Sequence, residues 1–140
     1  MAASYMNKIE YIFYNEAEIR ELVAEAKQKI TASLVRNDNK FSDPTAASAI
    51  RNLTPVEFIV LKERMIRAPE LWLEVIDKTR SWCYEQGGQF YRVLRARYLQ
   101  EKVTAVCKEI GITGDTFYRT LDKIKNYAAL WAAYFHLIRF

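Results

Sequence analysis

Residues 103–123 read VTAVCKEIGITGDTFYRTLDK and decide the fold of this chain, because they spell two short helices joined near a glycine. Gly111 suits the left-handed backbone of a tight turn between helices. Cys107 places a small side chain four residues before this glycine, where the two helices must pack closely. Apolar side chains from both helices and the turn face the interior, namely Val106, Ile110, Ile112, Phe117 and Leu121. The pattern is typical of a helix-turn-helix, which reads DNA with its second helix.

The second helix of this motif is expected to expose Tyr118, Arg119, Asp122 and Lys123. Basic residues gather around it: residues 87–125 hold eight Lys or Arg against four Asp or Glu, and the whole chain carries a net charge of +4. Such a surface suits DNA, because each phosphate that a cation neutralises releases counterions. The plainer alternatives are two amphipathic helices that meet near a glycine by chance, and a solvated charged face.

Length and composition point to a helical protein. The 140 residues suffice for one compact domain or for two small halves that share a core. Hydrophobic residues make up 51% and charged residues 27%, and only three Pro and four Gly interrupt the helical periodicity, which leaves strands little room. We therefore expect an all-α multi-helix bundle with a C-terminal helix-turn-helix. An N-terminal helical region would cover residues 1–68, and a DNA-binding region would cover residues 69–140.

Helix signals follow one another along the first third of the chain. An apolar stripe predicts a long helix over Asn15–Arg36, and the polar run after it predicts a loop over residues 37–42. Asp43 followed by Pro44 predicts the start of a short helix that ends near Asn52.

The middle of the chain repeats these signals. A capping box predicts a further helix, with Thr54, Pro55 and Glu57 at its start and Phe58, Leu61 and Met65 as its apolar residues. Pro69 must end that helix and can begin the next one, which continues to a stop and hinge at Gly87 and Gly88. Helical spacing resumes over Phe90–Tyr98 and leads into the helix-turn-helix.

Residues 126–140, NYAALWAAYFHLIRF, form the most apolar stretch. It is too short to span a membrane, and no apolar run follows a basic start, so we expect a cytoplasmic protein without a membrane partner. The tail must be buried against another surface. We expect it to fold back onto the N-terminal helices; the alternative is a homodimer through this C-terminal apolar helix, which palindromic DNA sites would favour.

Enzymatic chemistry finds little support in the sequence. His136 is the single histidine and lies within the apolar tail, where a structural role is expected. Cys83 and Cys107 are expected to stay reduced and buried, and with one histidine they make no zinc set. A phosphate-binding glycine loop and a nucleophile elbow are both absent from the sequence. We predict no enzyme activity, no catalytic residue, no metal site and no cofactor.

Three segments carry a resemblance to known families: VLRARYL at residues 93–99, AVCKEIGI at residues 105–112 and TFYRTLDKI at residues 116–124. The chain resembles phage late-gene transcriptional regulators of the RinA and ArpU type. Its helix-turn-helix is similar to region 4 of the bacterial sigma-70 factors. The resemblance implies a sequence-specific DNA-binding transcription regulator of phage or prophage origin, with double-stranded DNA and RNA polymerase as its partners.

The resemblance makes residues 113–123 the recognition helix, capped by Thr113, with Arg119 as the first candidate for a base contact. An arginine that bonds guanine through two acceptors contributes roughly 1–3 kcal/mol of discrimination. The alternative is a surface Arg119 that pairs with Asp115 or Asp122. The full set of DNA-binding candidates is Arg95, Arg97, Lys102, Lys108, Thr113, Asp115, Thr116, Tyr118, Arg119, Asp122 and Lys123.

Two other functions compete with transcription regulation. One is the DNA-recognition small subunit of a phage packaging terminase, which would assemble into a large ring. The other is a helical protein-interaction module without DNA binding. Gly114, where the families have a polar side chain, and Asp115, which phosphates repel, favour this last alternative.

Overall fold

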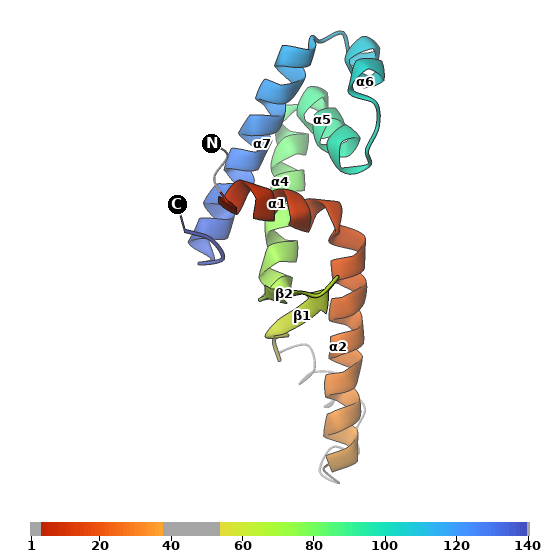
Figure 1. The fold of residues 1–140 in the computed structure, drawn as a ribbon, viewed down its shortest axis with the longest axis vertical. Coiled ribbons are helices and arrows are strands. Elements are labelled where there is room, and N and C mark those ends of the chain that lie inside the picture. Colours follow the sequence, from red (N-terminus) through yellow and green to blue (C-terminus); the bar gives the residue numbers. More distant parts are fainter. Residues whose placement is uncertain (1–3, 38–53, 140) are drawn as a thin grey trace. The chain divides into compact units, whose positions relative to one another are not determined.

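A computed structural model describes residues 4–37 and 54–139, with side chains over residues 4–32 and 54–139. This described part contains six helices and one two-stranded sheet, which confirms the expected all-α, multi-helix class (Figure 1). The elements in chain order are α1 (Ser4–Tyr14), α2 (Glu16–Asn37), β1 (Phe58–Leu61), β2 (Arg64–Arg67), α4 (Pro69–Gln86), α5 (Gly88–Tyr98), α6 (Val103–Ile110) and α7 (Gly114–Tyr134). The short helix predicted from Asp43 and Pro44 lies outside the described residues.

The chain divides into two compact units. The hairpin unit runs from Glu16 to Leu73 and contains α2, β1, β2 and the first turn of α4. The helix-turn-helix unit combines the described residues before Glu16 with those from Glu74 onward, so that α1 belongs with α5, α6 and α7. Within this unit α7 contacts α1, α5 and α6, which makes it the central element.

Helix α1 was not predicted from the sequence. It buries Ile9, Ile12 and Phe13 at helical spacing. Asn15 follows it, and the side-chain amide of this residue donates a hydrogen bond to the Tyr11 carbonyl oxygen at 2.8 Å. The long helix predicted over residues 15–36 is confirmed as α2, which buries Ile19 and Val23 and packs on β1 within the hairpin unit.

The predicted helix through Phe58, Leu61 and Met65 is wrong, because this segment forms the antiparallel hairpin of β1 and β2. Its register pairs Ile59 with Ile66, and their side chains are buried together with Leu61. The exposed face consists of alternate residues, namely Phe58, Val60 and Met65. The buried residues therefore alternate with a period of two, as in a strand, a structure that β-branched residues favour. The helix prediction rested on apolar residues spaced three and four apart, and this spacing did not decide the structure.

The capping box predicted at Thr54, Pro55 and Glu57 is also wrong. The backbone N–H of Val56 donates instead to the Glu70 carboxylate at 2.7 Å. The Ala68 N–H donates to the Glu57 carbonyl oxygen at 2.8 Å. The first bond ties the segment before β1 to the first turn of α4, the second closes the open end of the hairpin, and neither is a bond of a capping box.

Pro69 begins α4, and α4 ends at Gln86 before Gly87, as the sequence predicted. Gly87 has a φ of 118°, a conformation that L side chains rarely adopt, so it separates α4 from α5. Cys83 is fully buried on α4, and burial raises the pKa of its thiol to about 12. This thiol is therefore an inert part of the core, as expected.

The apolar tail does not form a separate element. Helix α7 runs without a break through 21 residues to Tyr134, so the predicted recognition helix and the tail are two halves of one helix. Ala128, Ala129 and Ala132 are buried, so one face of the tail packs within the chain, whereas Leu130 and Tyr134 are 62% and 71% exposed, against the expected burial of the whole tail. His136 follows with a φ of 60° and is exposed, so it has no place in the core. In the described part of the chain, no helix is long and apolar enough to cross a membrane.

The hairpin turn offers a test of this fold. Lys62 and Glu63 have φ values of 48° and 66°, and a left-handed conformation costs an L-residue roughly 1–2 kcal/mol. Glu63→Gly is expected to raise the free energy of unfolding by about 0.5–1 kcal/mol, because the relief of strain exceeds the entropy cost of glycine. Urea denaturation measures the change. Glu63→Ala keeps the strain and is the matched control; equal stabilisation by both variants would contradict the hairpin.

Candidate nucleic-acid interface

The turn between α6 and α7 has the geometry that its sequence predicts. Gly111 ends α6 with φ 70° and ψ 41°, in the left-handed region. The backbone N–H groups of Gly111 and Ile112 both donate to the Cys107 carbonyl oxygen, the latter at 3.0 Å. This is a Schellman-type end, which satisfies a carbonyl that the helix leaves free. The predicted role of Gly111 is confirmed.

Thr113 caps the start of α7, as predicted. Its backbone is extended, and its hydroxyl oxygen accepts a hydrogen bond from the Thr116 N–H at 3.1 Å. The two threonine hydroxyls also lie 3.0 Å apart, within hydrogen-bond distance. Asp115 occupies the first turn of α7, where a carboxylate favours the positive end of the helix dipole. These three side chains therefore hold the helix start in place.

The interior of the motif buries residues from three helices. Val93 on α5, Val106 on α6 and Phe117 on α7 are at most 2% exposed, and Leu121 extends this core along α7. Ile110, Ile112 and Cys107 are half-buried, so they lie at the margin of the core rather than within it. The apolar assignments made from the sequence are confirmed for Val106, Phe117 and Leu121.

The opposite face of α7 exposes Tyr118, Arg119, Asp122 and Lys123, as predicted. In the described part of the chain, Arg119 makes no ion pair with Asp115 or Asp122. Asp122 lies 3.8 Å from the Lys125 ammonium instead. Arg119 is thus an exposed guanidinium whose donors are available to another molecule.

The other basic candidates fall into two groups. Arg95, Lys102 and Lys108 are exposed on α5, before α6 and on α6. Arg97 lies instead against α1: its guanidinium is 3.6 Å from the Glu10 carboxylate and 5.8 Å from the Tyr14 ring centroid.

Glu10 binds a second cation within the same unit. Its carboxylate also lies 3.2 Å from the Lys125 ammonium. Burial and the nearby Glu10 raise the pKa of Tyr98, which packs on Phe13 at a ring-centroid distance of 5.0 Å. Glu10 therefore joins α1 to α5 and α7. Because Arg97 pairs with Glu10, its charge is already compensated within the helix-turn-helix unit.

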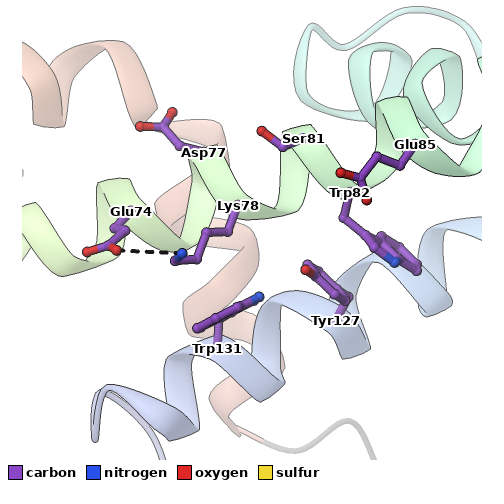
Figure 2. Close-up of a pocket in the computed structure, with 8 residues that line it drawn as sticks. All are labelled: Glu74, Asp77, Lys78, Ser81, Trp82, Glu85, Tyr127 and Trp131. Carbon is purple, nitrogen blue, oxygen red and sulfur yellow. Dashed lines mark ion pairs between the residues drawn. The ribbon is translucent and has the colours of Figure 1, made fainter.

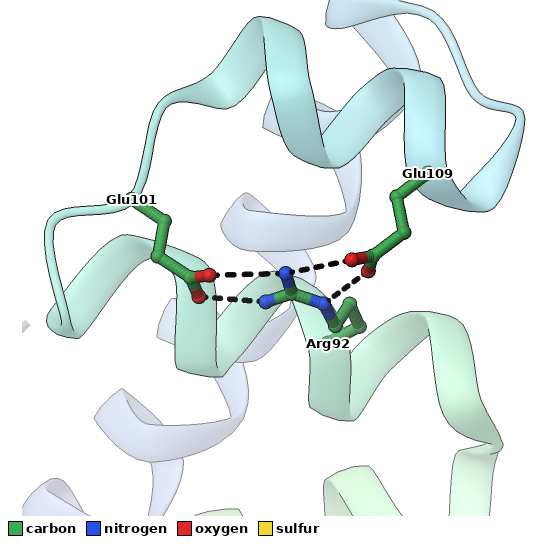
Figure 3. A network of polar contacts seen from close by, with 3 residues as sticks. All are labelled: Arg92, Glu101 and Glu109. Carbon is green, nitrogen blue, oxygen red and sulfur yellow. Dashed lines mark hydrogen bonds and ion pairs between the residues drawn. The ribbon is translucent and has the colours of Figure 1, made fainter.

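Arg92 was counted with the basic surface, yet it has a structural role that the sequence did not predict (Figure 3). Its guanidinium donates two hydrogen bonds to Glu101, at 2.6 and 3.0 Å, and two to Glu109, the shorter at 2.5 Å. The hydrogen bonds hold α5 to the loop before α6 and to α6 itself. Separations of 9 and 17 residues have no helical period, so the sequence holds no local signal of this network.

The network shifts the ionisation of all three side chains. Hydrogen bonds from Arg92 lower the pKa of Glu101 and of Glu109, and the two carboxylates raise the pKa of Arg92. The two carboxylates more than compensate the charge of Arg92, so the basic character of this surface rests on Arg95, Lys102, Lys108, Arg119 and Lys123.

The described residues hold no group of three or more His, Cys, Asp or Glu side chains that could bind a metal ion. In comparisons with known proteins, no family model, no curated protein and no solved structure matches the chain. The class that the structure defines is an all-helical protein with a capped helix-turn-helix.

Replacement of the two glycines of the helix-turn-helix by alanine is expected to change the stability in opposite directions. Gly111→Ala is expected to lower the free energy of unfolding by roughly 1–2 kcal/mol, because alanine tolerates a φ of 70° poorly. Gly114→Ala is expected to raise it by about 0.4–1 kcal/mol, because a Cβ there meets no atom within 4 Å and glycine costs more entropy. Thermal denaturation of the two variants measures both signs. Equal effects would contradict the turn geometry.

The Arg92 network predicts a dependence of stability on pH. The pKa values of Glu101 and Glu109 are lowered in the folded protein. Their contribution to the free energy of unfolding is therefore complete above the ordinary pKa of 4.5 and is lost as the pH falls below that value. Arg92→Met is expected to destabilise the protein at pH 7 and to approach the wild type in acid. Urea denaturation at several pH values measures this. A difference in the free energy of unfolding between Arg92→Met and the wild type that stays the same at every pH would contradict the network.

Proposed function

We propose that the helix-turn-helix unit binds double-stranded DNA, with residues 113–123 in the major groove. The observation that supports this most directly is Arg119, an exposed guanidinium without an ion-pair partner among the described residues. It lies on the outward face of α7, between Tyr118 and Lys123 and opposite the buried Phe117 and Leu121. A rigid helix with a free guanidinium on its outer face is what base readout requires.

The remaining candidates have roles that follow from their positions. Arg95, Lys102 and Lys108 are exposed cations that can neutralise phosphates and so orient the protein without reading sequence. Thr113, Thr116 and Asp115 stabilise the start of the helix, so the negative charge of Asp115 has a structural use. Asp122 is partly compensated by Lys125.

We infer further that the chain is a transcription regulator of the phage type that its sequence resembles, with RNA polymerase as the second partner and without enzyme activity. A terminase small subunit would use the same helix-turn-helix but assemble into a large oligomer. Analytical ultracentrifugation separates the two, since a regulator sediments as a monomer or dimer and a ring does not.

The DNA proposal is tested with duplexes enriched from a random library by the wild-type protein. Arg119→Ala is expected to weaken binding of the enriched duplex by about tenfold, the equivalent of roughly 1.4 kcal/mol, and to reduce its preference over unselected DNA. Lys108→Ala is expected to weaken both duplexes alike, because a phosphate contact carries no sequence information. Fluorescence anisotropy at several salt concentrations measures both effects.

Lys29→Ala, an exposed lysine of α2, is the matched control and is expected to leave both affinities unchanged. Failure to enrich any sequence, together with no binding of duplex DNA at low salt, would overturn the proposal. Equal effects of Arg119→Ala on both duplexes would overturn the assignment of Arg119 to base readout.

A further inference from the structure

A groove lies between α4 and α7 within the helix-turn-helix unit, and DNA binding does not use it (Figure 2). Its volume is about 410 Å³, which is within the range of roughly 300–1,000 Å³ that ligand sites occupy. The lining combines aromatic side chains with carboxylates. The aromatic residues are Trp82, Tyr127 and Trp131, and the acidic residues are Glu74, Asp77 and Glu85.

The aromatic side chains are held rigidly. The Trp82 and Tyr127 rings stack with centroids 4.3 Å apart and an interplanar angle of 6°. Phe90 meets the Trp82 ring edge-on at 5.5 Å. All three residues are half-buried, so part of each side chain remains accessible. Preorganised aromatic faces of this kind bind at a low cost in conformational entropy.

The groove already contains a cation of its own. The Lys78 ammonium lies 4.3 Å from the centroid of the Trp131 ring, and 3.8 Å from the Glu74 carboxylate (Figure 2). Both are surface contacts of modest strength, because the side chains of Lys78 and Glu74 are 35% and 48% exposed. A cation from another molecule can therefore replace Lys78 at small cost.

Charge decides what kind of molecule can enter. Glu74, Asp77 and Glu85 contribute three carboxylates to the lining, against the single ammonium of Lys78, but Asp77 also lies 3.6 Å from the Arg80 guanidinium on the same helix. Glu85 is exposed and makes no ion pair within the described part of the chain. Because Glu74 and Asp77 are each paired with a cation of α4, the remaining charge of the groove is the carboxylate of Glu85, which attracts a cation and disfavours a phosphate. Aromatic rings beside carboxylates favour a cation with an apolar stem.

We propose that this groove binds an arginine-bearing or lysine-bearing segment of a partner protein. The cation displaces Lys78 from the Trp131 ring, its charge is matched by Glu74 and Glu85, and its methylene stem packs on the Trp82 and Tyr127 pair. Arginine suits the site best, because a planar guanidinium stacks on aromatic rings and donates to carboxylates at the same time. The groove does not depend on DNA binding, so either proposal can fail without the other.

The experiment titrates the full chain with a blocked tetra-arginine peptide and follows the indole N–H signals of the tryptophans by NMR. Trp82 and Trp131 are expected to shift, whereas Trp72, which is 1% exposed in the hairpin unit, is expected to stay unchanged. A tetra-citrulline peptide has the same size without the charge and is expected not to bind.

Variants test the individual contacts. Trp131→Leu is expected to weaken peptide binding by about threefold to fivefold, and Glu85→Gln by about twofold. Glu25→Gln, an exposed glutamate on α2, is the matched control. Lys78→Ala is expected to strengthen binding severalfold, because it removes the resident cation. A purely structural role of Lys78 cannot produce that gain.

Several results would overturn the proposal. Equal binding of the arginine and citrulline peptides would show that charge does not drive binding. Weaker binding of the arginine peptide to the Lys78→Ala variant would show that the peptide does not displace Lys78. If the indole N–H signals of Trp82 and Trp131 do not shift at millimolar peptide, the peptide does not bind in this groove. Shifts of Trp82 and Trp131 that depend on protein concentration alone would assign the groove to a second copy, and shifts on addition of duplex DNA would assign it to nucleic acid.

Discussion

Burial of one face of α7 is the interaction on which the helix-turn-helix unit depends. Phe117, Leu121 and Ile124 are almost fully buried, and Ala128 and Ala132 continue this buried face to the end of the helix. The alanines are small enough to let other helices approach closely, and α1, α5 and α6 all contact α7. Because α7 is one continuous helix, the proposed DNA surface near its start and the aromatic groove near its end belong to a single rigid element.

Internal ion pairs then decide which charges are available to a partner. Arg92 is held by Glu101 and Glu109, and Arg97 and Lys125 are held by Glu10. The contacts of Glu10 join helices that lie far apart in the sequence. Around the helix-turn-helix, the exposed cations that remain are therefore fewer than the composition of residues 87–125 suggests.

Local signals in the sequence predicted the motif well. Gly111, the Thr113 cap and the start of α4 at Pro69 depend on backbone conformation and near neighbours, which a few residues specify. The hairpin was missed because the short apolar run of residues 58–61 is compatible with a helix as well as with a strand. The choice of strands depends on α2 covering Ile59 and Leu61, a contact with a distant segment.

The sequence by itself determined the helical class, the glycine turn, the cap of α7 and the face that exposes Arg119. Each of these follows from dihedral preferences or from a 3.6-residue period, both of which operate within one element. Tertiary structure alone decided that α1 packs with the C-terminal helices, that Arg92 and Arg97 are used internally, and that Trp82 meets Tyr127. Those contacts join different elements, most of them remote along the chain, and no rule that operates within one element specifies which side chains will meet.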